Sequence, residues 1–229
     1  MLNFTGIGSA FNPEEGNTSA YFSEEDSFYL IDFGELVFKE LLREVDFSIF
    51  SDLHIFITHS HSDHIGSLGT LISYLHHHHS IPVTIYHGGI HLVDFLNRVG
   101  ISPSYYEEVT DKKLALKHFT FEWIETKHSD KIACFGLLLS FKDSIIYYSG
   151  DARILPERIY QAFMTDEIDL IYQDLLIDPE NTSHLTLKKL TDLIPKSERQ
   201  RIIAMHLEEN SKEAIEAVGF QTAQKTEKN

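Results

Sequence analysis

A stretch of six residues rich in histidine constrains this chain more than any other feature of its sequence. His59, His61, Asp63 and His64 follow the apolar run 55–57 and precede a stretch with helical apolar spacing. Imidazole nitrogens and a carboxylate are good ligands for a borderline divalent ion such as zinc. Alternate side chains of an extended segment point the same way. We therefore expect His59 and His61 to share one ion, and Asp63 and His64 to turn toward a second.

A polar turn between a strand and a helix is the alternative interpretation of this stretch. It accounts for Asp63, because a carboxylate is favourable near a helix N-terminus, but it leaves the three histidines unexplained. Three other residues also stand where an apolar run meets a loop, namely His128, Asp151 and His206. Each of them alone could be an ordinary turn residue, but together they supply the further ligands that two ions need. The pattern favours a metal centre.

Apolar runs with strand-like and helix-like spacing alternate along the whole chain. Strands are expected at 28–31, 53–58, 82–86, 119–126, 134–141, 144–149, 168–172 and 201–205, and helices at 35–47, 65–75, 90–99, 185–193 and 211–218. The three successive strands between residues 119 and 149 require antiparallel pairing, with a hairpin turn at Lys142-Asp143. This makes a doubly wound parallel sheet, which expects crossovers throughout, the second choice. We predict an α/β protein with one domain over residues 1–229, a four-layer αββα sandwich of two mixed sheets with helices outside.

Composition limits the class of protein and its compartment. The chain has 229 residues, 42% of them apolar and 24% charged, which is ordinary for a globular protein. Its one cysteine, Cys134, excludes an internal disulfide framework and a zinc site built on several thiolates. There is no apolar run of about 18 residues, and the first residues do not have the pattern of a secretory signal. These features predict a cytoplasmic protein with no membrane partner.

The charge of the chain bears on its substrate. Lys and Arg number 19 against 35 Asp and Glu, so the net charge is −16. Such a chain repels the phosphate backbone of a long nucleic acid unless a basic patch compensates. A small anionic substrate remains compatible with this charge, because a bound metal ion inverts the local field.

A second histidine-rich tract, residues 76–79, ends the helix expected at 65–75. One interpretation is a surface tract that binds metal. The favoured interpretation is a solvated helix C-terminus, where any positive charge suits the helix dipole.

With these motifs in place, the chain resembles the metallo-β-lactamase superfamily, and within it the ribonuclease Z-type phosphodiesterase branch. The segments that carry the resemblance occur in the expected order: 6–11, 17–19, 30–34, 59–64, His128, 149–151, 184–186 and His206. The resemblance implies an αββα fold and a hydrolase centre with two metal ions. A lactamase-type hydrolase is disfavoured, because Asp151 and not a thiolate occupies the bridging position.

The resemblance also implies a role for each residue of the site. The ligands would be His59, His61 and His128 for one ion, Asp63, His64 and His206 for the other, and Asp151 as the bridge between them. The ions would be two Zn²⁺, with Mn²⁺ as the alternative. Asp63 would also orient the attacking water, and His184 would be the general acid that protonates the leaving oxygen. The alternative for His184 is an exposed residue near the start of the helix at 185–193.

The resemblance leaves several substrates open. The compact length, the acidic charge and segment 16–21 are most similar to the phage anti-Pycsar phosphodiesterases, which degrade cyclic mononucleotides. We therefore expect hydrolysis of 3′,5′-cyclic nucleotides to nucleoside monophosphates, by a homodimer that acts in the host cytoplasm if a phage encodes it. The alternatives are a tRNA 3′-processing endoribonuclease (ribonuclease Z), a cyclic phosphate-ester hydrolase, a redox relative, and a metal-binding regulator without catalysis.

Overall fold

The computed structural model describes residues 1–226 of the chain. They divide into unit 1, which comprises residues 1–111 together with 224–226, and unit 2, which comprises residues 112–223. Each unit is built around one β-sheet. The expectation of a single domain over residues 1–229 concerns how the units combine, and it stays a prediction. Residues 227–229, the end of that range, lie outside the described residues.

The sheet of unit 1 has six strands and mixed pairing. In spatial order they are β1 (Asn3–Gly6), β2 (Ser19–Glu24), β3 (Ser27–Ile31), β4 (Asp52–Ile57), β5 (Val83–His87) and β6 (Glu107–Val109). The pairs β1–β2 and β2–β3 are antiparallel, and the pairs from β3 to β6 are parallel. Because neighbouring parallel strands end at the same edge, the residues that follow β3, β4 and β5 share one edge of this sheet.

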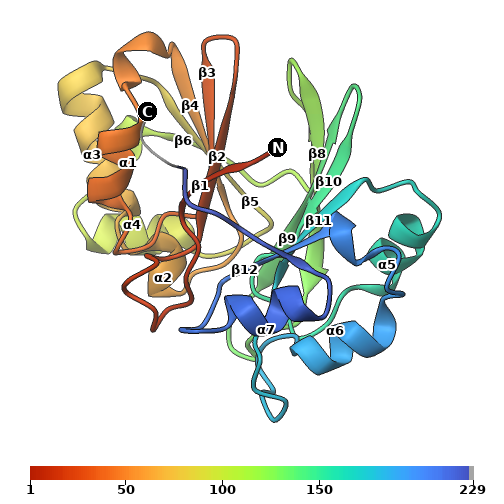
Figure 1. The fold of residues 1–229 in the computed structure, drawn as a ribbon. Helices are drawn as coiled ribbons and strands as arrows, with labels where there is room; N and C mark the ends of the chain where they lie inside the picture. Colours follow the sequence, from red (N-terminus) through yellow and green to blue (C-terminus); the bar gives the residue numbers. More distant parts are fainter. Residues whose placement is uncertain (227–229) are drawn as a thin grey trace. The chain divides into compact units, whose positions relative to one another are not determined.

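Four helices belong to unit 1: α1 (Phe38–Glu44), α2 (Ser62–Ile65), α3 (Leu68–Tyr74) and α4 (Leu92–Arg98). The helices α1 and α3 lie against one face of the sheet (Figure 1), where Leu41 and Leu71 are fully buried. The prediction of a single helix over residues 65–75 is wrong. The backbone of Phe33 interrupts it, because Phe33 N donates to the carbonyl of His64 (2.6 Å) and Ser67 N donates to the carbonyl of Phe33 (3.3 Å).

The histidine tract 76–79 forms a wide π-helical turn, Leu75–His79, at the end of α3. The turn ends at Ser80, which has a left-handed φ of 54°. The ring of His76 stacks on Tyr105, with 3.8 Å between ring centroids. The first three histidines are exposed, which agrees with a solvated helix terminus.

The sheet of unit 2 has seven strands and is also mixed. In spatial order they are β13 (Gln221–Thr222), β12 (Ile202–Met205), β11 (Leu170–Asp174), β10 (Ile145–Tyr148), β9 (Cys134–Phe141), β8 (Phe119–Thr126) and β7 (Lys113–Ala115). The pairs from β7 to β10 are antiparallel, and those from β10 to β13 are parallel. Phe141 N donates to the Ser144 carbonyl (2.9 Å) and closes the β9–β10 hairpin at the predicted turn. The doubly wound parallel alternative is therefore wrong.

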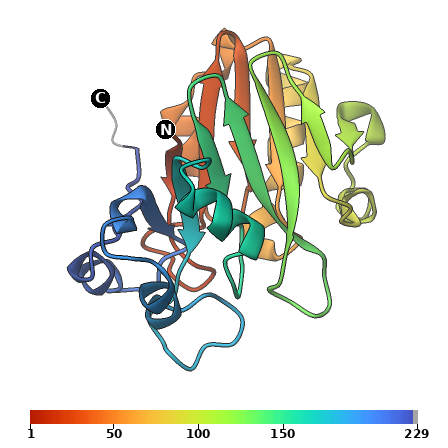
Figure 2. The same cartoon turned by 90° about the vertical axis from the view of Figure 1, so that its right-hand side faces the viewer.

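The helices of unit 2 are α5 (Glu157–Met164), α6 (Leu187–Leu193) and α7 (Lys212–Ala217). Helix α5 was not expected, although Ile159 and Phe163, four residues apart, are its buried residues. Figure 2 shows α5 lying across one face of this sheet. Both units thus combine a mixed sheet with helices, which confirms the α/β class. Among residues 1–226, no helix has the length and apolarity needed to span a membrane.

Candidate metal centre

The first cluster of predicted ligands lies at the carboxyl end of β4, in unit 1. The strand ends at Ile57, and the loop that follows carries His59 and His61 before α2 begins at Ser62. His61 has an extended backbone at the N-cap of α2, so Asp63 and His64 fall in the first turn of this helix. His59, Asp63 and His64 are buried, and His61 is half-buried. The structure brings these four predicted residues together.

A buried carboxylate, Asp32 at the end of β3, orients two of these histidines. It accepts hydrogen bonds from Thr58 N, from the Thr58 hydroxyl and from His64 Nδ1, each at 2.8 Å. Because the Thr58 hydroxyl donates its one hydrogen to Asp32, it accepts the bond from His59 Nδ1 at 3.1 Å. Both imidazoles therefore carry their hydrogen on Nδ1 and keep the lone pair on Nε2 for a ligand.

The spacing of the donor atoms in this cluster suits metal ligation. His59 Nε2 lies 3.0 Å from His61 Nδ1, and His64 Nε2 lies 3.3 Å from Asp63 Oδ2. Two ligands on a tetrahedral ion with bonds of about 2.1 Å stand about 3.4 Å apart. The nitrogen and oxygen donors in unit 1 thus fit a divalent ion in both chemistry and spacing.

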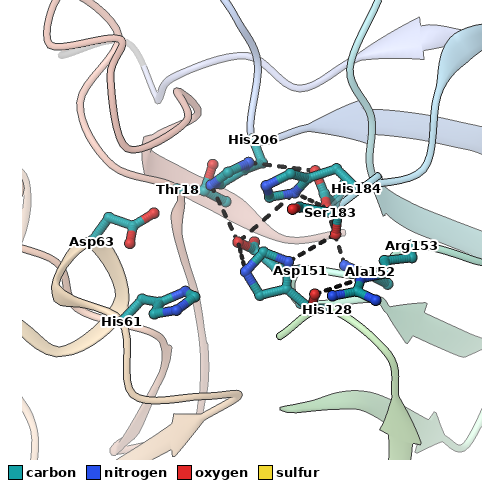
Figure 3. Close-up of polar contacts among 12 residues, drawn as sticks. Thr18, His61, Asp63, His128, Asp151, Ala152, Arg153, Ser183, His184 and His206 are labelled. Atoms are coloured by element: carbon teal, nitrogen blue, oxygen red, sulfur yellow. Dashed lines mark hydrogen bonds and ion pairs between the residues drawn. The ribbon is translucent and has the colours of Figure 1, made fainter. Parts of the chain in front are cut away.

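The second cluster lies in unit 2 and centres on Asp151. His128 follows β8, Asp151 follows β10, His184 precedes α6 and His206 follows β12. Figure 3 shows the three imidazoles around the Asp151 carboxylate. Asp151 Oδ2 lies 3.5 Å from His128 Nε2, 3.6 Å from His206 Nε2 and 3.9 Å from His184 Nδ1. These distances are too long for strong hydrogen bonds and close to the spacing of ligands on a shared ion.

A second buried carboxylate, Asp174 at the end of β11, supports this cluster. Its Oδ2 accepts from His184 Nδ1 at 2.6 Å and from Ala152 N at 3.0 Å, and its Oδ1 lies 3.4 Å from His206 Nδ1. Asp151, Asp174, His184 and His206 each offer one ligand atom, and these atoms lie within 4.8 Å of one another. Asp174 therefore orients a histidine of unit 2, as Asp32 does in unit 1.

The environment of His184 stabilises its protonated form. Burial is the largest single influence and acts against the imidazolium. The Asp174 carboxylate, its hydrogen bond and the charge of Asp151 together outweigh burial, so the pKa of His184 is raised above its usual value. A raised pKa makes a histidine better suited to donate a proton near neutral pH.

Two residues of the clusters have unusual backbone conformations. Asp32 and His206 have left-handed φ values of 58° and 57°. Such a conformation is uncommon for residues other than glycine, although Asp and His adopt it more readily than most. Here the turn ends β3 and β12 abruptly and aims a buried polar side chain into each cluster.

Asp32 and Asp174 were missed as functional residues by the sequence argument. Asp32 stands inside segment 30–34, which carries the family resemblance, but it was given no role. Both carboxylates stand at the end of a buried strand, as Asp151 does. The same rule that singled out Asp151 could therefore have found them.

Sequence comparison identifies relatives along the whole chain. The sequence matches the family described as "Anti-Pycsar protein Apyc1" over residues 1–89 and 87–228. It is similar to the anti-Pycsar protein Apyc1 of Paenibacillus xerothermodurans. The two sequences are 22% identical over an alignment of 237 positions, which covers 94% of this chain and 90% of the relative.

Structure comparison identifies the fold. The metallo-β-lactamase fold protein YhfI from Bacillus subtilis has a TM-score of 0.74 and 16% identity, covering 100% of this chain and 96% of that chain. The short form of human tRNase Z (ELAC1) has a TM-score of 0.71 and 18% identity, covering 97% of this chain and 95% of that chain. The predicted metallo-β-lactamase fold is confirmed.

Proposed function

Because the chain belongs to the anti-Pycsar protein Apyc1 family, we propose that it hydrolyses 3′,5′-cyclic nucleotides to nucleoside monophosphates as a phosphodiesterase with two metal ions. Family and fold together make the chain a metal-dependent hydrolase. The observation that carries the proposal is the arrangement in unit 2, where histidines surround Asp151 and Asp174 holds His184.

The proposed centre combines the ligands of both clusters. They are His59, His61 and His128 for one ion, Asp63, His64 and His206 for the other, and Asp151 as the bridge. The donor types and the spacing within each unit support divalent ions, with zinc first and manganese as the alternative. Ions held there would supply Lewis-acid activation of both the water and the phosphodiester.

The side chains of this protein would handle the protons of the reaction. In hydrolysis, the water oxygen bonds to phosphorus, the bond from phosphorus to the 3′ oxygen breaks, and that oxygen needs a proton. Since His184 Nδ1 is held by Asp174 at 2.6 Å, its Nε2 is the atom that donates this proton. Asp63 would accept a hydrogen bond from the attacking water and orient it.

The net negative charge of the chain supports a small substrate over a long nucleic acid. The chain carries a net charge of −16, which disfavours a long nucleic acid held along a basic surface. The similarity to the anti-Pycsar protein of Paenibacillus xerothermodurans supports cyclic mononucleotides as the substrate. We also propose a homodimer that works in the cytoplasm, or in the host cytoplasm if a phage encodes it, and that removes a cyclic-nucleotide signal of antiphage defence.

The runner-up substrate is a tRNA 3′ end, because the fold is shared with human tRNase Z. A cyclic phosphate ester is a further alternative within the same reaction class. A metal-binding regulator without catalysis is disfavoured, because it has no need to retain both the seven ligands and a histidine held as a proton donor.

Metal analysis combined with turnover of bis(p-nitrophenyl) phosphate tests the proposed reaction. We expect about two transition-metal ions per chain, loss of turnover on chelation, and recovery when zinc or manganese is restored. Turnover by protein shown to hold no metal would overturn the metal mechanism. Fully metallated protein without turnover would favour the regulator.

A further inference from the structure

The side chain of Arg153, two residues after Asp151, holds the loop that carries His128. Its Nε donates to the carbonyl oxygen of His128 at 2.6 Å, and its backbone N donates to the carbonyl of Lys127 at 2.6 Å. Its Nη1 lies 3.3 Å from Asp130 Oδ1. Residues 127–133 have no helix or strand of their own, so the two hydrogen bonds help to define where His128 lies.

These contacts belong to a closed ring of hydrogen bonds within unit 2, and Figure 3 labels every residue of this ring except Asp174. The links in order are Arg153 Nε to the His128 carbonyl, His128 Nδ1 to the Ser183 carbonyl, His184 Nδ1 to Asp174 Oδ2, and Ala152 N to the same Asp174 oxygen. The peptide bonds 183–184 and 152–153 complete the ring. Arg153 thus connects the loop of one histidine to the segment that holds the other.

The ring fixes which nitrogen of His128 can bind a metal. A carbonyl oxygen only accepts, so the 2.9 Å contact with Ser183 places the hydrogen of His128 on Nδ1. The lone pair is then on Nε2, the atom that lies 3.5 Å from Asp151 Oδ2. The direction of this lone pair depends on where the His128 backbone lies, and Arg153 holds that backbone.

We propose that Arg153 is a positioning residue, which sets His128 for metal binding and, through Ser183, sets the loop that carries His184. The inference rests on the proposed function, since it assigns His128 to a metal ion. Arginine suits this role because its planar guanidinium donates in fixed directions, which a lysine ammonium does not. The ion pair with Asp130 contributes little, because Asp130 has 89% of its side chain exposed.

Metal titration of the purified apoprotein tests this proposal without measuring catalysis. Co²⁺ is the probe, and its visible absorption reports binding and ligand geometry. Arg153→Gln should bind one of the two ions about 10- to 100-fold more weakly than the wild type, as is usual when a residue that orients a ligand is lost. Arg158→Gln is the matched control, because Arg158 is an exposed arginine of the same unit that pairs with Glu122.

Three results of these titrations would contradict the account. Wild-type protein that binds no Co²⁺ would overturn the proposed function and the inference with it. Wild-type protein that binds two ions, with Arg153→Gln binding them equally tightly, would overturn the inference alone. If Arg153→Gln does not fold, Arg153→Lys decides, because it retains one donor and should show an intermediate affinity. Wild-type affinity and an unchanged Co²⁺ spectrum in Arg153→Lys would then refute the positioning role.

Discussion

Two buried carboxylates, Asp32 and Asp174, prepare the histidines of the two units in the same way. Each accepts from an imidazole Nδ1 and from a backbone N–H of a neighbouring strand end. Because both carboxylates are fully buried, loss of either would leave donors without a partner, at a cost of about 1–3 kcal/mol per group. The imidazoles that these carboxylates contact are therefore held in a fixed orientation by the protein itself.

Asp151 is the residue whose loss should be most damaging to activity. Asp151→Ala removes the carboxylate at the centre of the unit 2 cluster, and His61→Ala removes a proposed ligand from unit 1. We expect either change to abolish hydrolysis with little loss of fold, since the core consists of apolar strands. Turnover after metal loading and circular dichroism check this. Turnover close to the wild type in metallated Asp151→Ala would contradict the bridging role.

His184→Ala should separate proton donation from metal binding. The variant should retain its metal ions and bind substrate nearly normally, while turnover of a cyclic nucleotide falls by about 10² to 10⁴. Turnover of bis(p-nitrophenyl) phosphate should fall much less, because p-nitrophenolate leaves without needing a proton. The ratio of the two rates is the measurement. Equal losses on both substrates would show that His184 supports structure only.

At the scale of elements, the local sequence pattern predicted the strands better than it predicted where a helix is interrupted. The bounds of β8 and β9 were predicted fully, because apolar residues alternate with polar ones along much of β8 and β9 is mostly a continuous apolar run. The break between α2 and α3 could not be predicted, since the backbone that causes it, at Phe33, is distant in sequence. The short edge strands β6 and β7 lack an apolar signal, because much of their surface is exposed.

A histidine on β4 should make the stability of unit 1 depend on pH. His54 on β4 lies 3.0 Å from the Tyr86 hydroxyl and 3.1 Å from Asp52. Burial lowers the pKa of His54, and Asp52 opposes this only in part. Burial raises the pKa of Tyr86 to about 12, so its hydroxyl stays neutral over the pH range in which His54 titrates. The unfolded chain therefore binds the proton of His54 more readily, and the free energy of unfolding falls as pH drops below about 6.5.

His54→Gln should make this dependence on acid shallower, because glutamine does not titrate. Urea unfolding at about pH 7.5 and about pH 5.5 measures the effect for both proteins. His54→Gln should lose less unfolding free energy between these two conditions than the wild type. An equal loss in both proteins would exclude His54 as a source of acid sensitivity.

At the scale of the whole molecule, the candidate site was more predictable than the contacts that shape it. The seven predicted ligands and His184 could be nominated because they lie within family motifs, several of them where a strand meets a loop. The orienting contacts of Asp32, Asp174 and Arg153 could not, because they join segments that lie 32, 22 and 25 residues apart in the sequence.

Metal should also stabilise the fold. Asp63 and Asp151 are buried carboxylates among histidines, and bound cations compensate such charges. Removal of metal with a chelator should lower the midpoint of thermal unfolding, and zinc should restore it. Identical midpoints with and without metal would contradict a centre built from these ligands.

The most direct test of the central claim compares a small cyclic diester with a long RNA. Steady-state cleavage of 3′,5′-cyclic mononucleotides and of a pre-tRNA should be measured with metal-loaded protein at low and moderate salt. We predict faster cleavage of a cyclic mononucleotide, with weak salt dependence, because metals in the site and not a basic surface hold it. Faster cleavage of the pre-tRNA, with a rate that falls steeply as salt rises, would contradict the account and favour a ribonuclease Z activity.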